Sequence, residues 1–242
     1  MRGVQLLAFD TATPATTVAL ALADGQVLAR RHEPAAGERP GHVAELLPLA
    51  LALLAEAGVD FPQLDRLAVG IGPGTFTGLR IGVATARALA QAHDLPLVAV
   101  STLRSLAAGA PADDAPATLA VLDARRGEAF AAAWTRGAAA QAAPAPLLAA
   151  AALTPEALAD AAASLPPGTL AVGDGALRFR AVLEAVGAVV PADGSAAHRV
   201  DASVHARLAA AMEPDARDAV LPAYLRLPDA ELALRRRRAD EP

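Results

Sequence analysis

The chain contains neither cysteine nor lysine, and all 21 of its basic residues are arginine. Without cysteine, no disulfide framework and no thiolate metal site can form. Without lysine, a Walker-type phosphate loop and Schiff-base chemistry are both excluded. Aromatic residues make up only 3% of the chain, so we expect a core built from leucine, valine and alanine.

Long apolar runs are missing as well. No stretch of about 18 residues is free of both charge and proline, so we expect no transmembrane helix. The first ten residues hold too short an apolar run for a signal peptide. The net charge of −5 gives the surface as a whole no attraction for nucleic acid. We therefore expect a cytoplasmic protein without membrane contact.

The sequence also lacks recognisable catalytic motifs. No two of the five histidines stand at positions i and i+4 of one predicted helix, so this common metal-binding pair is absent. No serine lies in the G-x-S-x-G turn that carries many nucleophiles. The sequence predicts a well-built fold without catalytic residues, resident metal or cofactor.

The most informative stretch covers residues 67–89, LAVGIGPGTFTGLRIGVATARAL. Residues 67–71 predict a buried strand, and Gly72-Pro73-Gly74 predicts a tight turn. Thr75 or Thr77 is expected to cap a helix over 75–92 through its hydroxyl. A strand, turn and helix in this order is typical of α/β proteins, and taken alone it is compatible with a purely structural role.

Small residues recur every four positions along this helix, at Gly78, Gly82, Ala86 and Ala90, and therefore share one face. Each glycine costs a helix about 0.5–1 kcal/mol relative to alanine, so another segment should approach closely there. That segment is either the home sheet or a partner helix. We expect the glycines to serve the fold and the leucines of helix 42–57 to serve a partner.

The order of predicted elements repeats along the chain. It consists of strands 4–10, 16–22 and 26–32, helix 42–57, strand 67–71, helix 75–92, strand 97–100 and helix 103–108, then strands 118–123 and 128–134, helix 154–164, strand 169–172, helix 176–186, strand 189–190 and helix 201–212. Residues 137–152 carry little pattern. The repeat predicts an α/β protein with two subdomains, 1–108 and 118–226, joined by a hinge at 109–117 and followed by a flexible arginine-rich tail at 227–242.

The first predicted strand ends on Asp10, and Thr11 and Thr13 follow it before a hairpin. This order resembles the opening of the actin, Hsp70 and sugar-kinase architecture, in which the aspartate holds a hydrated metal and the threonines face phosphate. A plain β-meander with an aspartate in its turn is equally compatible. We name Asp10, Thr11 and Thr13 as a vestigial nucleotide or phosphate loop.

The run GIGPGTFTGLRIGVATARALA resembles the TsaB family, also called YeaZ. LLAFDTAT, HVAELLP, VAVSTL, VLDARRGEAF and AYLRLP extend the resemblance over most of the chain, while residues 137–165 match poorly. The resemblance implies two actin/Hsp70-like (ASKHA, ribonuclease H-like) subdomains, each a mixed sheet flanked by helices.

The resemblance also implies a function. The family supplies a non-catalytic dimerisation subunit of the complex that forms N6-threonylcarbamoyladenosine at position 37 of ANN-decoding tRNAs. It pairs with a catalytic TsaD-type paralogue through its first two helices, a TsaE-type ATPase joins the pair, and tRNA is met only through the complex. Alone, such a subunit is expected to form a homodimer. The partner-binding residues expected here are His42, Val43, Leu46, Leu47, Leu51, Leu54, Arg80 and Ile81.

In TsaD a His-x-x-x-His metal pair falls where this chain carries Thr102 and Leu106. Leucine cannot ligate a metal, so the resemblance implies a relative that has lost the metal. Three alternatives stay open from the sequence. Helix 42–57 is an ordinary core helix, the chain is a small-molecule kinase or metallopeptidase of the same fold, or it is a self-associating module without a role in tRNA modification.

Overall fold

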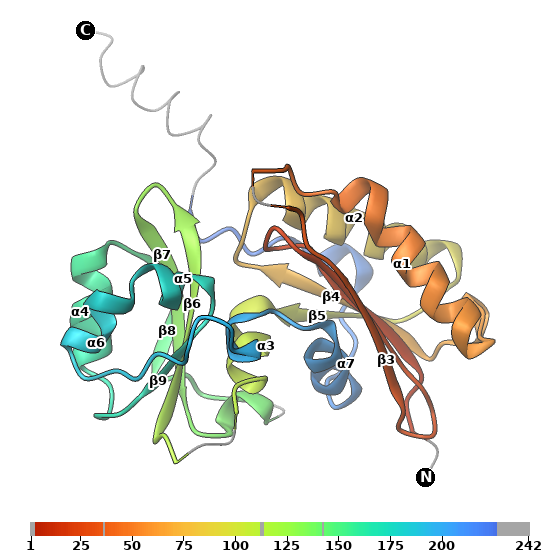
Figure 1. Cartoon of the computed structure of the whole chain (residues 1–242). Helices are drawn as coiled ribbons and strands as arrows, with labels where there is room; N and C mark the ends of the chain where they lie inside the picture. The colour runs from red at the N-terminus through yellow and green to blue at the C-terminus, as the bar shows by residue number, and fades with distance from the viewer. Residues whose placement is uncertain (1–2, 36, 112–113, 142, 227–242) are drawn as a thin grey trace, which may run out of the picture.

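The computed structural model describes residues 3–35, 37–111, 114–141 and 143–226, which form two lobes (Figure 1). The first sheet has the order β3-β2-β1-β4-β5 and the second the order β8-β7-β6-β9. The strands are β1 (Leu6–Asp10), β2 (Thr16–Ala21), β3 (Val27–His32), β4 (Arg66–Gly72), β5 (Leu97–Ser101), β6 (Ala117–Arg125), β7 (Glu128–Thr135), β8 (Leu148–Leu153) and β9 (Leu170–Val172). The helices are α1 (His42–Ala57), α2 (Phe76–Ala92), α3 (Thr102–Ala108), α4 (Pro155–Ala163), α5 (Asp174–Arg178), α6 (Arg180–Ala185) and α7 (Ala202–Ala210).

The two sheets repeat one topology. In the first, β1, β2 and β3 form an antiparallel meander, and β4 pairs parallel to β1. In the second, β6, β7 and β8 form the meander, and β9 pairs parallel to β6. All five residues of β1 are buried, as a strand covered on both faces requires. The prediction of two α/β units with a shared order is therefore confirmed for the first four strands of each sheet. The strand predicted at 189–190 is only an isolated bridge between Val189 and Leu170.

Two parts of the second lobe differ from the sequence predictions. The alanine-rich segment 137–152 contributes the unpredicted edge strand β8, which pairs with β7. The single helix predicted over 176–186 is two short helices, α5 and α6, separated at Phe179, where the backbone leaves the helical region. Neither feature has a strong periodic signal in the sequence.

Each lobe contains one helix from the other half of the sequence. Leu103 and Leu106 of α3 pack with Leu122 and Trp134 of the second sheet. Val204 of α7 packs in a cluster with residues of the first sheet, and Figure 1 shows α7 lying under that sheet. The limits 1–108 and 118–226 thus separate the two sheets but not the two cores, because each lobe borrows a helix from the other half of the sequence. The domain limits themselves stay a prediction.

After α7 the chain returns along the first lobe as a C-terminal strap, residues 213–226. The strap is held by hydrogen bonds from Asp215 N–H to Leu97 O (2.8 Å) and from Ala223 N–H to Ile71 O (2.8 Å). It brings Tyr224 to the start of α2. The predicted tail at 227–242 lies outside the described residues. Within the described ranges, no helix is long and apolar enough to cross a membrane.

Candidate functional site

The tight turn before α2 contains a cis peptide bond between Gly72 and Pro73, and Gly72 has a φ of 100°. The hydroxyl cap predicted for this helix does not form. Thr75 stands at the N-cap with an extended backbone, but its side chain accepts no hydrogen bond from the helix. Instead, the N–H of Thr75 donates to Ala12 O at 2.8 Å, so the turn is tied to the loop after β1.

The small-residue ladder of α2 faces the chain's own first lobe. Gly78 and Gly82 are both buried. A Cβ on Gly78 would overlap the carbonyl oxygen of Thr11, and one on Gly82 would overlap its hydroxyl, both inside the 3.0 Å limit of real contacts. Thr11 Oγ1 also donates to Gly78 O at 2.7 Å. The close approach thus comes from the β1–β2 loop and leaves the opposite side of α2 for other contacts.

The residues expected to bind a partner divide into two groups. His42, Leu46 and Leu54 are buried, and His42 Nδ1 lies 2.8 Å from Thr16 Oγ1. Burial lowers the pKa of His42. These three residues therefore belong to the core of this chain, which corrects their assignment to a partner face.

The other three α1 residues expected to bind a partner point outward. Val43, Leu47 and Leu51 are exposed to 78%, 42% and 53%, and their spacing of four places them on one stripe. On α2, Arg80 is exposed and Ile81 half-buried, and the small residues Ala84 and Ala88 are also exposed. Because α1 and α2 contact one another, the apolar stripe on α1 lies beside α2, whose exposed side carries the small residues Ala84 and Ala88.

A buried polar network lies where the resemblance places the lost metal. Asp10 is fully buried. Its Oδ2 accepts a hydrogen bond from Thr102 Oγ1 at 2.7 Å and lies 3.0 Å from His205 Nε2, while its Oδ1 accepts from Ala12 N–H at 2.7 Å. On the other side of the imidazole, His205 Nδ1 lies 2.8 Å from Ser105 Oγ. The network joins β1, α3 and α7.

The electrostatics of this network follow from its geometry. Burial alone would raise the pKa of Asp10, but the contacts with His205, Thr102 and the Ala12 amide outweigh it, and the pKa is lowered. Leu106 is also buried, in the core of the second lobe. The two positions at which the resemblance implies a lost histidine pair thus carry a structural hydroxyl and a core leucine. Among the described residues, no group of three His, Asp or Glu side chains could hold a metal.

The three residues of the predicted phosphate loop do not meet at one cavity. Asp10 and Thr11 are buried with their side chains bonded to the protein. Thr13 alone borders a cavity of about 280 Å³, which is also lined by Asp174 and His198. Burial raises the pKa of Asp174. In the sequence, Asp174 stands between Gly173 and Gly175, and no catalytic or binding pattern surrounds it.

A second cavity, of about 600 Å³, was missed by sequence reasoning. It lies between the start of α2, the β6–β7 turn and the C-terminal strap, and its lining residues are Gly74, Thr75, Phe76, Arg80, Asp123, Ala124, Arg125, Arg126, Phe130, Ala223, Tyr224, Leu225 and Arg226. Two segments that stand out in the sequence, the Gly-Pro-Gly turn and AYLRLP, contribute residues to its lining. They lie next to one another only because of the path that the strap takes.

Comparisons with known proteins agree with this architecture. A family model described as "TsaD: tRNA N6-adenosine threonylcarbamoyltransferase" matches residues 34–169. The curated protein TsaB of Escherichia coli (strain K12) is 41% identical over 134 residues, which cover 55% of this chain and 56% of that protein. TsaB of Haemophilus influenzae is 38% identical over 131 residues, 54% of this chain and 53% of that protein. The chain thus spans about half the length of the curated relatives it matches.

Solved structures extend the likeness over nearly the whole chain. A Pseudomonas aeruginosa protein described as similar to peptidase YEAZ has a TM-score of 0.73 and 31% identity, covering 92% of this chain and 100% of that one. YeaZ from the same organism has a TM-score of 0.71 and 30% identity over the same shares. The two repeated sheets with exchanged helices define an actin-like (ASKHA) α/β protein. Within that class, the chain belongs to the TsaB (YeaZ) family.

Proposed function

We propose that this chain is the non-catalytic partner subunit of a cytoplasmic complex that forms N6-threonylcarbamoyladenosine in tRNA. In this proposal it binds a TsaD-type catalytic subunit, a TsaE-type ATPase joins the pair, and tRNA is modified only by the complex. Membership of the family and the names of its curated relatives support the assignment. The kinase and metallopeptidase alternatives are not favoured, because the ancestral metal positions carry Thr102 and Leu106 and both are packed in the core.

The observation that carries the proposal is the outward stripe of Val43, Leu47 and Leu51. An isolated exposed leucine is ordinary on a protein surface, but three apolar residues aligned along one helix form a contact face. Ala84 and Ala88 on the exposed side of α2 would let a partner helix lie close to this face. The buried residues of the same helix anchor the stripe rigidly.

The same face accounts for self-association when the catalytic subunit is absent. A stable homodimer would bury roughly 1,200–2,000 Å² in total. We expect the isolated chain to elute as a dimer in gel filtration with light scattering. A monomer at tens of micromolar would contradict this part of the proposal.

The decisive experiment places a charge on the stripe. Leu47→Arg and Leu51→Arg should leave a folded subunit that loses at least a hundredfold in affinity for the TsaD-type subunit, because an unpaired buried charge costs several kcal/mol. Leu147→Arg is the matched control, since Leu147 is 46% exposed on the other lobe. Affinity is measured by titration, and folding by circular dichroism melts. If both α1 variants bind normally, the face is misassigned.

A further inference from the structure

The cavity of about 600 Å³ beside the strap has a size suited to a ligand and a marked charge imbalance. Arginines from three separate parts of the chain line it, together with one acidic residue. The arginines are Arg80 from α2, Arg125 and Arg126 from the β6–β7 turn, and Arg226 from the strap, and the acid is Asp123. For a chain with a net charge of −5, this is a local reversal of sign.

Arg80 is held in a fixed orientation at this cavity. Its guanidinium carbon lies 3.7 Å from the ring centroid of Phe76, and its Nε donates to the hydroxyl of Tyr224 at 2.9 Å. Within the described ranges, its two terminal nitrogens have no hydrogen-bond or ion-pair partner. A stacked guanidinium with free terminal nitrogens is suited to the oxygens of a phosphate.

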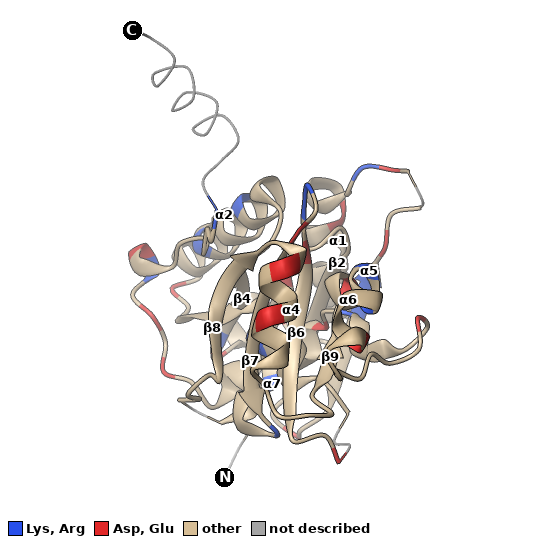
Figure 2. Ribbon diagram, turned by 90° about the vertical axis from the view of Figure 1, so that its left-hand side faces the viewer, with Lys and Arg blue, Asp and Glu red and all other residues tan. Residues whose placement is uncertain are grey.

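The nearby acidic side chains are already paired with other arginines, which leaves the charge of Arg80 unbalanced among the described residues. Asp123 already lies 3.0 Å from Arg178 and 3.7 Å from Arg125, and Arg226 pairs with Glu128 at 2.7 Å. The first turn of α2 contains no acidic residue, so the positive end of its dipole adds to the field. Figure 2 shows the arginine-bearing part of α2 close to the end of the described chain. The cavity therefore favours an anion.

The aromatic rings at the cavity further restrict the class of anion that would bind there. Tyr224 is 41% exposed, and its ring centroid lies 5.2 Å from that of Phe76. An exposed ring beside arginine is the arrangement with which proteins stack single-stranded bases without sequence preference. A magnesium–nucleoside triphosphate would need a free carboxylate for its metal, but Asp123, the one acid of the lining, is held by two arginines.

We propose that this arginine–tyrosine pocket, comprising Phe76, Arg80, Arg125, Tyr224 and Arg226, holds one nucleotide unit of an RNA strand. The phosphate lies against Arg80 and the base stacks on Tyr224. The source of the RNA rests on the proposed function, in which a tRNA is the substrate of the complex. The pocket gives the non-catalytic subunit its own contact with that substrate.

The test is fluorescence anisotropy of a labelled short oligouridine with the full chain and its variants. Arg80→Gln and Tyr224→Leu should each weaken binding about tenfold, and Arg80→Gln should reduce the slope of log affinity against log salt by about 0.7, the value for one lost phosphate contact on a single strand. Arg87→Gln is the matched control. It removes the same charge from the same helix at a residue paired with Asp218 at 2.9 Å, and should change affinity less than twofold.

Three results would overturn the inference. The first is equal RNA binding by wild type, Arg80→Gln and Tyr224→Leu. The second is displacement of the oligouridine by AMP at equal concentration, which would identify a free nucleotide as the ligand. The third is loss of affinity for the TsaD-type subunit in Arg80→Gln without loss of RNA binding, which would return Arg80 to the partner face. The Leu47→Arg titration contains no RNA, so it tests the proposed function independently of the RNA-binding experiment.

Discussion

Replacing His205 with alanine tests the buried network most directly. In the wild type, Asp10 and His205 are both fully buried, with Asp10 Oδ2 3.0 Å from His205 Nε2. The substitution leaves the carboxylate with only its bonds from Thr102 and the Ala12 amide. Removing the partner of a buried carboxylate leaves an uncompensated charge, which costs about 3–5 kcal/mol. For a chain of this size, the melting temperature should fall by roughly 6–20 °C.

The loss should depend on pH in a defined direction. In the wild type, the pKa of Asp10 is lowered, so its contribution is complete above its unfolded value of about 3.9 and is lost as the pH falls through the lower folded value. Without His205, Asp10 loses the contact that lowers its pKa most, so its pKa in the variant should lie above the wild-type value. The variant therefore loses stability at neutral pH relative to the wild type, and this difference disappears as the pH falls through the higher pKa of the variant. The difference in unfolding free energy between the wild type and His205→Ala should therefore become smaller as the pH is lowered.

The assay is urea unfolding followed by circular dichroism at neutral pH and in steps down to about pH 4. His42→Ala is the matched control at neutral pH, because His42 is also buried but contacts the neutral hydroxyl of Thr16 at 2.8 Å. It removes the same volume without leaving a buried charge, and should cost less than His205→Ala. The reasoning would be refuted if His205→Ala lowered the free energy of unfolding by less than about 1 kcal/mol. It would also be refuted if the difference in unfolding free energy from the wild type stayed constant with pH.

Two other predictions concern the fold and the absent metal. Gly78→Ala should cost about 1–3 kcal/mol in urea unfolding, because the new Cβ meets the backbone of Thr11. Gly194→Ala meets nothing within 4 Å and should be close to neutral, so equal losses would contradict the packing argument. Elemental analysis of the pure protein should find no stoichiometric iron or zinc, since Leu106 offers no ligand. One equivalent of either metal, lost on chelation together with an activity, would show the opposite.

The first lobe could be predicted from the sequence because its signals are local. Strand β1 is a short apolar run, and Gly72-Pro73-Gly74 marks the turn before α2. The apolar pattern of α1 predicts either a partner face or a core helix, but it does not show on which side each residue lies. His42 and Leu54 needed the position of β2 and of the sheet before they could be assigned to the core.

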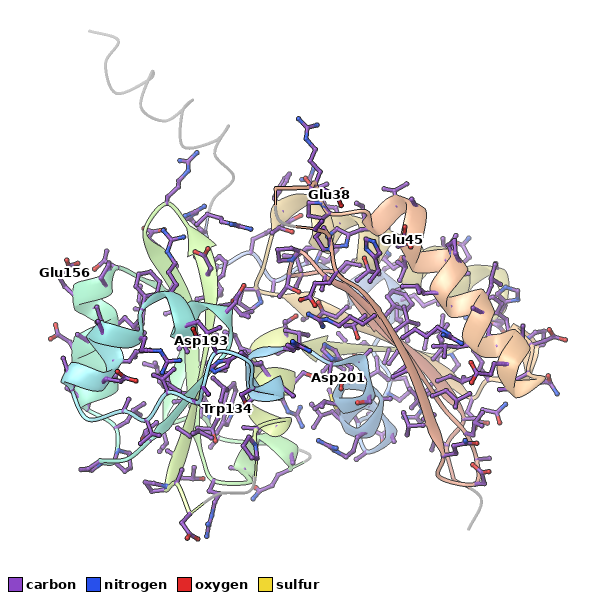
Figure 3. The ribbon with its side chains drawn as sticks, viewed as in Figure 1. Glu38, Glu45, Trp134, Glu156, Asp193 and Asp201 are labelled. Carbon is purple, nitrogen blue, oxygen red and sulfur yellow. The ribbon has the colours of Figure 1, made fainter. Side chains whose placement is uncertain are left out.

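The parts that could not be predicted depend on contacts between distant segments. Strand β8 consists of alanines between two leucines, so neither β propensity nor alternation marks it, and its pairing with β7 defines it. The network of Asp10, Thr102 and His205 spans nearly the whole chain. It forms because α7 packs against the first sheet and against α3, and Asp201 at its start lies near the centre of the molecule (Figure 3).

The network also changes how the absent histidine pair is understood. Thr102 does not leave a gap at the ancestral metal position, because it donates to Asp10 and accepts from Gly72 N–H at 3.1 Å. Its hydroxyl thus connects the first strand to the turn that begins α2. Through Asp10, whose Oδ2 lies 3.0 Å from His205 Nε2, the same hydroxyl is also linked to α7. Because α2 contacts α1, the turn that Thr102 holds also helps to position the helix that bears the exposed stripe.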